Sequence, residues 1–154
     1  MENEPTIWVD ADAAPRVVRE VLLKAADKRE VKTIFVANRW MEDPKSAFAT
    51  AYVVGQGQDV ADDYIAENCV AGDLCITADI PLAARVVDKG GDVITPRGRD
   101  LDKDNVTEAL SLRDFHDELR NSGVQTGGPA PFDDKAKQLF ANALDRWITR
   151  RKSR

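Results

Sequence analysis

Acidic residues follow the first apolar stretch of the chain, where a strand gives way to a helix. The stretch Ile7-Trp8-Val9 is made of strand-forming residues, and Asp10 and Asp12 come directly after it. Pro15 suits the first position of a helix, because that position needs no N–H donor. Ligands bind beyond the carboxyl ends of the strands in an open parallel sheet. We therefore expect Asp10 and Asp12 to lie at a binding edge of such a sheet.

Further polar residues occupy the corresponding place after two later predicted strands. They are Asp59, Asp62 and Asp63 after one strand, and Thr77 and Asp79 after the other. Because parallel strand ends share one edge, carboxylates gathered there repel one another, and a hard cation such as Mg²⁺ or Mn²⁺ keeps them ionised. With phosphate oxygens and water, such a cation supports hydrolysis of a phosphodiester. Metal-dependent phosphodiester hydrolysis is therefore the chemistry that these residues predict.

Each acid also has a structural alternative. Asp59 can cap its helix, and Asp63 lies in a first turn, where the helix dipole favours any acid. We expect the structural role for Asp63 and leave both roles open for Asp62. Asp79 can cap the next helix, but its place directly after a strand favours the cleft. The structural alternative is weakest for Asp10, because a carboxylate at the end of a buried strand needs partners.

Alternating strands and helices must position these residues. Strands are predicted at 7–9, 32–37, 51–54, 74–77 and 92–95, and helices at 16–29, 58–68, 81–89, 106–112, 113–121 and 133–150. The alternation up to about residue 98 predicts an α/β fold with a mostly parallel sheet of about five strands and helices on both faces. A helical C-terminal part follows at about 104–150. The length of 154 residues favours one domain, 1–154, whose α/β core covers about 6–98.

Apolar spacing identifies the inner faces of two of these helices. In the helix at 58–68 the inner face is predicted to contain Val60, Ala61, Tyr64 and Ile65. In the last helix it is predicted to contain Ala136, Leu139, Phe140, Ala143, Leu144, Trp147 and Ile148. We expect both stripes to pack in the core.

Composition narrows the classes of function. The net charge of -5 argues against a broad basic surface that coats duplex nucleic acid, although it allows a local basic rim. No run is long enough to cross a membrane, and the N-terminus lacks the basic and apolar regions of a signal peptide. Cys69 and Cys75 form no CxxC pair, so we expect reduced, buried thiols and a cytoplasmic protein without a membrane partner.

Motifs along nearly the whole chain resemble the YaiI/YqxD family of small, largely uncharacterised bacterial proteins. The matching segments are Asp10–Pro15, Gln58–Asp62, Ile76–Ala83, Thr95–Gly98, Arg113–Phe115 and Gly123–Pro129. That family is in turn similar to PIN domains, which are Mg²⁺- or Mn²⁺-dependent ribonucleases with an acidic cluster on an α/β sheet. The resemblance implies a PIN-like three-layer α/β/α fold and RNA, single-stranded or structured, as the partner.

The same resemblance implies roles for the acids. Asp10 and Asp79 match two PIN metal ligands, whereas the middle PIN acid, usually a Glu on a helix, has no clear match. Asp62 or Asp59 is the proposed substitute. The acid that commonly follows the strand-four Asp is also absent, so a four-acid site would recruit Asp12. A further departure is an alanine at position 14, where the family usually has Cys.

Several residues are candidates for binding phosphate or substrate. They are Thr77, Arg97, Arg113, Thr126, Gly127 and Gly128. The Thr-Gly-Gly segment is as readily a plain turn as a phosphate loop. The only histidine, His116, is expected at the surface or between helices. For the basic tail at 146–154, solvation of a helix end is favoured over steering of RNA.

The leading hypothesis is a metal-dependent ribonuclease in which Asp10 and Asp79 bind the metal and Asp12 and Asp62 support them. One alternative is a haloacid-dehalogenase-like phosphatase with Asp10 as nucleophile and Asp12 as general acid. Those enzymes usually carry Thr where Ala14 stands here, which counts against that alternative. Another is a non-catalytic RNA-binding or protein-interaction module on a degraded nuclease fold.

Overall fold

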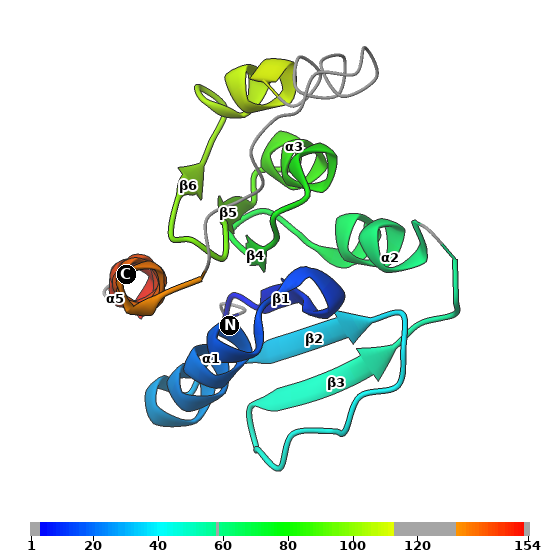
Figure 1. Cartoon of the computed structure of the whole chain (residues 1–154), viewed down its shortest axis with the longest axis vertical. Helices are drawn as coiled ribbons and strands as arrows, with labels where there is room; N and C mark the ends of the chain where they lie inside the picture. Colours follow the sequence, from blue (N-terminus) through cyan, green and yellow to red (C-terminus); the bar gives the residue numbers. More distant parts are fainter. Residues whose placement is uncertain (1–3, 58, 113–131, 153–154) are drawn as a thin grey trace.

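The computed structural model describes residues 4–57, 59–112 and 132–152 (Figure 1). The elements are β1 (Ile7–Asp10), η1 (Ala11–Ala13), α1 (Arg16–Arg29), β2 (Thr33–Ala37), β3 (Ala49–Val53), α2 (Val60–Asn68), β4 (Leu74–Ile76), α3 (Ile80–Asp88), β5 (Asp92–Ile94), β6 (Asp100–Leu101) and α5 (Asp134–Lys152). Residues 106–112 are also helical. None of the helices in these described ranges is long and apolar enough to cross a membrane.

The sheet within the described ranges has six strands in the order β3-β2-β1-β4-β5-β6. All neighbouring pairs are parallel except β5 and β6, which are antiparallel. From β1 the chain first proceeds outward through β2 and β3, and then returns to the other side of β1 for β4. The strand order therefore reverses between β1 and β4, and in doubly wound sheets such a switch point is where ligands bind.

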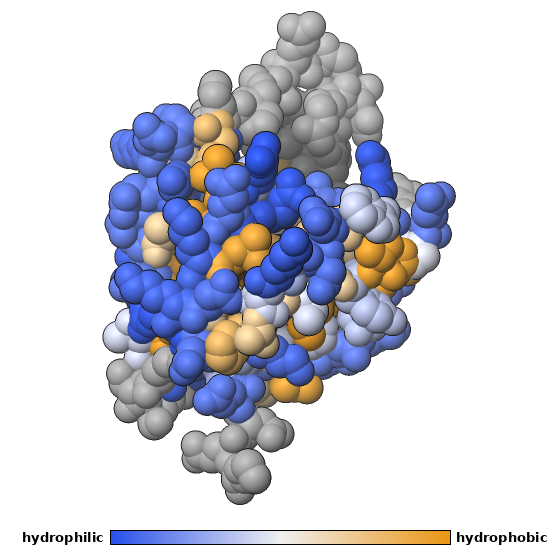
Figure 2. Space-filling model, turned by 90° about the horizontal axis from the view of Figure 1, so that it is seen from below, coloured by the Kyte–Doolittle hydropathy of each residue, from blue (hydrophilic) through white to orange (hydrophobic). Residues whose placement is uncertain are grey.

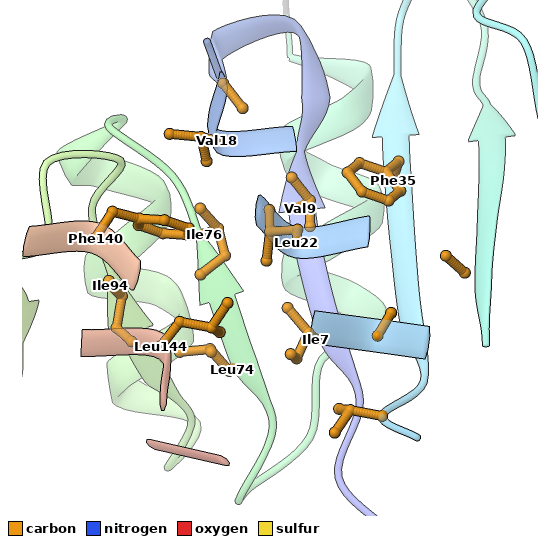
Figure 3. Close-up of a cluster of buried hydrophobic side chains, with 14 of the residues drawn as sticks. Ile7, Val9, Val18, Leu22, Phe35, Leu74, Ile76, Ile94, Phe140 and Leu144 are labelled. Carbon is orange, nitrogen blue, oxygen red and sulfur yellow. The ribbon is translucent and has the colours of Figure 1, made fainter. Parts of the chain in front are cut away.

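Helices cover both faces of this sheet (Figure 1). On one face, α1 and α5 enclose a core that includes Ile7, Val9, Leu22, Phe35 and Phe140 (Figure 3). On the other face, α2, α3 and the helix at 106–112 pack over a second cluster that includes Trp8, Ile65 and Leu82. Successive β1 side chains point to opposite faces, as the two-residue period of a strand requires. The predicted three-layer α/β/α architecture is confirmed.

The C-terminal helix α5 is joined to the core by side-chain hydrogen bonds. The indole Nε1 of Trp147 donates to Asp92 on β5 at 2.8 Å, and Arg151 donates to the same carboxylate. On α1, Arg29 donates to Asp145 and Thr149 of α5. Part of the basic tail thus has a structural role, because Arg151 also lies over the Trp147 ring.

The edge strand β3 is covered by the loop that precedes it. The Asp43 carboxylate accepts a hydrogen bond from the Ala51 N–H at 2.8 Å. The Ser46 hydroxyl accepts from the Ala49 N–H at 3.1 Å and donates to Asp27 on α1. The loop is therefore fixed both to β3 and to α1.

Three details differ from the sequence-based predictions. The two-residue strand β6 was not predicted and extends the sheet beyond the expected five strands. Asp59 stands at the N-cap position of α2, but its side chain makes no capping hydrogen bond. Val60 and Leu139, predicted on inner faces, are 37% and 49% exposed. Each predicted stripe therefore includes one residue that is partly exposed to solvent.

Other predictions are confirmed or lie outside the described ranges. Cys69 and Cys75 are buried and free. The predicted helix at 113–121 and the turn-rich segment at 122–131 lie outside the described residues, and with them Arg113, His116 and the Thr126-Gly127-Gly128 segment.

Candidate active site

The centre of the candidate site is a chain of hydrogen bonds between the ends of β1 and β4. These strands are neighbours, with Val9 paired to Ile76. Thr77, the next residue, donates its hydroxyl to Asp10 Oδ2 at 3.0 Å, and the Thr77 oxygen accepts from the Asp79 N–H at 3.0 Å. Asp10 is only 7% exposed and Thr77 is buried. Thr77 therefore positions both acids, and its hydroxyl makes both of these bonds within the protein.

Asp79 combines the two roles that the sequence left as alternatives. Its Oδ1 accepts a hydrogen bond from the Leu82 N–H at 3.0 Å and so caps α3, where Pro81 lies in the first turn. Its carboxylate also forms a hydrogen bond with the Asp62 side chain. The helix cap thus fixes the orientation of a carboxylate that belongs to the acidic cluster.

Asp62 completes a cluster of three interacting carboxyl groups. It lies in the first turn of α2. Burial, the charges of Asp79 and Asp10, the hydrogen bond with Asp79 and the charge of Asp59 raise the pKa of Asp62 from 3.8 to about 7. A protonated Asp62 is stabilised because it can donate to Asp79. Near neutral pH Asp62 is therefore partly protonated.

The pKa of Asp10 is affected by burial and by neighbouring charges in the same way. Burial raises the pKa of the Asp10 carboxyl above its usual value of 3.8, and the hydrogen bond from Thr77 partly offsets this effect. The negative charges of Asp79 and Asp12 raise the pKa further. Three acids from β1, α2 and the start of α3 therefore repel one another at the switch point of the sheet.

Asp12 is hydrogen-bonded to Asn38, a residue that the sequence did not identify as part of the site. Asp12 is exposed, and its Oδ2 accepts a hydrogen bond from the Asn38 N–H at 2.6 Å. The Asn38 side-chain amide donates to the Gly57 carbonyl at 3.1 Å. Asn38 thereby joins the end of β1, the end of β2 and the turn that leads into α2. The sequence feature that could have identified Asn38 is its side-chain amide, which directly follows a predicted strand.

The remaining candidates lie in different surroundings. Asp59 is exposed and acts on Asp62 through its charge. Asp63 forms an ion pair with Arg85 at 2.8 Å, in line with the structural role predicted for it. The Arg97 guanidinium, in the turn after β5, lies 5.6 Å from the centre of the Phe132 ring.

The acids have the donor chemistry of a magnesium or manganese site but do not form a complete one. In the part of the chain that the structure describes, no three Asp, Glu, His or Cys side chains are arranged to hold a metal ion. Mg²⁺ is often bound by one or two carboxylates, with water and substrate phosphate as its other ligands. Hard oxygen donors and a proton on Asp62 that a cation would replace fit this second kind of site.

The fold and the cluster define the class of protein as a doubly wound α/β protein with acidic residues at the switch point of its sheet. The chain belongs to the YaiI/YqxD family, because the model of that family, described as "Uncharacterized BCR, YaiI/YqxD family", matches residues 8–150.

Similar proteins agree with this assignment. A UPF0178 protein from Desulfotalea psychrophila is 56% identical over 94% of this chain and 97% of its own length. UPF0178 proteins from Shewanella halifaxensis and Saccharophagus degradans are 51% and 52% identical over 94% of this chain and 95% of their own lengths. No solved structure matches this chain significantly. The names of these relatives state no activity.

Proposed function

We propose that this protein is a divalent-metal-dependent phosphodiesterase that acts on RNA. The observation that carries the proposal is the convergence of Asp10, Asp62 and Asp79 from three separate elements at the switch point of the sheet. Such a concentration of carboxylates is costly without a cation. The resemblance to PIN domains supports RNA as the substrate.

Asp10 and Asp79 are the proposed ligands of Mg²⁺ or Mn²⁺. Each is held by a neutral donor: Asp10 by the Thr77 hydroxyl and Asp79 by the Leu82 N–H. These bonds fix the orientation of both carboxylates. A cation bound there supplies positive charge for the phosphate and acidity for an attacking water.

Asp62 is the third acid in this proposal. Its pKa of about 7 means that Asp62 readily gives up its proton near neutral pH. Loss of that proton provides the additional negative charge that a cation requires. Asp12 and Asp59 add negative charge at the rim, with Asp12 oriented by the Asn38 N–H. Arg97 is a proposed phosphate contact, and so are Arg113, Thr126, Gly127 and Gly128, outside the described residues.

Binding of Mn²⁺ tests the metal site directly. Calorimetric titration of wild type, Asp10→Asn and Asp79→Asn is expected to show at least about a tenfold loss of affinity in both variants. Asp63→Asn is a matched control, because Asp63 is adjacent to Asp62 but paired with Arg85. It should bind Mn²⁺ like wild type. Equal binding by wild type and Asp10→Asn, or none by either, would contradict the site.

Cleavage of single-stranded and structured RNA in Mn²⁺, compared with EDTA, tests the activity. A non-catalytic RNA-binding module is the second candidate, favoured by the incomplete metal site among the described residues. RNA binding that persists in EDTA and in both variants, without cleavage by wild type in Mn²⁺, would support that module. A fluoroberyllate adduct at Asp10 would instead support phosphatase chemistry.

A further inference from the structure

Trp40, in the loop after β2, is far more exposed than the other tryptophans. Its side chain belongs to a residue that is 81% exposed, the highest value for any large hydrophobic residue in the described ranges. Trp8 and Trp147 are 7% and 1% exposed, as is usual for tryptophan, and both donate their indole N–H to a carboxylate. Figure 2 shows the side of α1, β3 and the loop between β2 and β3, where hydrophilic side chains predominate. Trp40 therefore contributes little to the core.

The fold leaves the indole of Trp40 free to contact a ligand. Among the described residues it makes no hydrogen bond and stacks on no other ring. Tyr52, in contrast, is 47% exposed but stacks on Tyr64, with the ring centres 4.6 Å apart. Arg39, directly before Trp40, is also exposed and forms no ion pair within the described part of the chain. The loop therefore presents an unpaired cation next to an uncovered aromatic ring.

Trp40 also lies at the edge of the sheet that carries the acids. It follows the carboxyl end of β2, whose Val36 is paired with Asp10. The Asn38 N–H donates to Asp12 at 2.6 Å, and the charge of Asp12 acts in turn on Asp10. Because consecutive Cα atoms are about 3.8 Å apart, the Cα of Trp40 lies within about 7.6 Å of that of Asn38. A polymer bound at the acids can therefore extend to Trp40.

The exposed groups of this loop match the parts of an unpaired nucleotide. An uncovered indole binds bases by stacking, and an arginine binds phosphate. A base in a duplex is already stacked on its neighbours, so only an unpaired base offers its face to a side chain. Glu42 and Asp43 are also exposed in this loop, so stacking on Trp40 is expected to contribute more to binding than the charge of Arg39. These groups therefore favour a single strand over a duplex.

We propose that Trp40 stacks on an unpaired base of a single-stranded RNA and that Arg39 contacts the phosphate of the same strand. The place of this nucleotide beside the cleaved phosphodiester rests on the proposed function. Stacking on Trp40 itself requires neither the metal nor cleavage.

Tryptophan fluorescence tests the stacking contact directly. Trp8 and Trp147 are buried, so a base that binds at the surface is expected to quench the emission of Trp40 alone. Titration with pentauridylate in EDTA, which prevents metal-dependent cleavage, should quench wild type but not Trp40→Phe. An RNA duplex should quench wild type much less, because its bases are already stacked. Absence of quenching by pentauridylate, or equal quenching by the duplex, would overturn the proposal.

Fluorescently labelled pentauridylate measures the affinity of each variant. Trp40→Ala should weaken binding between about fivefold and a hundredfold, the range expected for the loss of one stacked base. Trp40→Phe keeps an aromatic ring and should retain most of the affinity. Both variants should unfold at the Tm of wild type, because Trp40 is 81% exposed. Wild-type affinity in Trp40→Ala, or an equal loss in the two variants, would overturn stacking.

The salt dependence of binding tests Arg39 separately. One phosphate contact to a single strand contributes about -0.7 to the slope of log affinity against log salt concentration. Arg39→Gln should make the slope less negative by about this amount, whereas Trp40→Ala should leave the slope unchanged. Lys32→Gln is the matched control, because Lys32 is an exposed cation at the opposite end of β2. An unchanged slope in Arg39→Gln, or the same change in Lys32→Gln, would overturn the phosphate contact.

Cleavage distinguishes this proposal from the proposed function. Quenching of Trp40 by pentauridylate, with no RNA cleavage by wild type in Mn²⁺, would uphold the stacking contact and reject the phosphodiesterase. Cleavage with an unchanged KM in Trp40→Ala would do the reverse. Sedimentation of wild type and Trp40→Ala tests a second copy of this chain as the occupant. A wild-type dimer that Trp40→Ala dissociates would overturn RNA as the ligand of Trp40.

Discussion

The Thr77 hydroxyl stands between the carboxylate of Asp10 and the backbone N–H of Asp79, at 3.0 Å from each. One side chain therefore determines the position of two acids from different strand ends. The bond to Asp10 also lowers the pKa of that carboxyl against the larger effect of burial. Thr77 therefore contributes both to the stability of the fold and to the pKa of Asp10.

Thr77→Val should lower the free energy of unfolding by about 1–3 kcal/mol, because it leaves two buried polar partners unsatisfied. It should also raise the pKa of Asp10. Urea denaturation measures the stability, and carboxyl NMR titration measures the pKa. Thr77→Ser keeps the hydroxyl and serves as the control. Equal stability of the Val and Ser variants would show that these hydrogen bonds contribute little.

Asp62→Asn should change how stability depends on pH. Because the pKa of Asp62 is raised from 3.8 in the unfolded chain to about 7 in the fold, its stabilising contribution is complete below about pH 4. It is lost as the pH rises through about 7. Asparagine stays neutral, so the variant should gain stability relative to wild type between pH 4 and pH 8. Parallel stability curves from chemical denaturation at several pH values would refute the shifted pKa.

Metal binding should also depend on the protonation of Asp62. A cation bound at these acids must displace the proton of Asp62, so the Mn²⁺-dependent rise in Tm should be larger at pH 8 than at pH 6. Thermal unfolding with and without Mn²⁺ at both pH values measures it. In Asp62→Asn this pH dependence should largely disappear. A rise in Tm that is independent of pH in wild type would place the cation elsewhere.

Gly98→Ala should destabilise the protein by about 1–3 kcal/mol through backbone strain alone. Gly98 has a φ of +88°, and a Cβ there would lie 2.6 Å from the Leu139 carbonyl carbon and oxygen on α5. Gly55→Ala is the control, since a Cβ at Gly55 would have no neighbour within 4 Å. Urea denaturation compares them. Similar effects of the two substitutions would mean that neither the positive φ of Gly98 nor its close approach to α5 restricts this position.

The amphipathic and alternating parts of the fold could be predicted from the sequence. The predicted bounds of α1 match those observed, Arg16–Arg29, because a regular apolar period is framed by Pro15 and by Glu30 in a left-handed conformation. The alternation of strands and helices predicted a parallel sheet, and therefore that the acids after its strands lie at the same edge. Both features depend on local sequence.

Features that depend on distant partners could not be predicted. The two residues of β6 form a strand only because β5 is beside them. Leu139 continues the apolar stripe of α5 but is exposed, while its backbone packs against Gly98. The hydrogen bond between Asp62 and Asp79 and the bond between Asp12 and Asn38 join residues from different elements of the fold. In each case the partner is fixed only by tertiary packing.

The loop that covers β3 has a consequence for the behaviour of the protein in concentrated solution. An uncovered edge strand offers its N–H groups as a template on which another chain can add a strand, and aggregation begins in this way. Here Ser46 and Asp43 already occupy the N–H groups of Ala49 and Ala51. The same short loop that is bonded to α1 therefore also prevents another chain from extending the sheet at this edge.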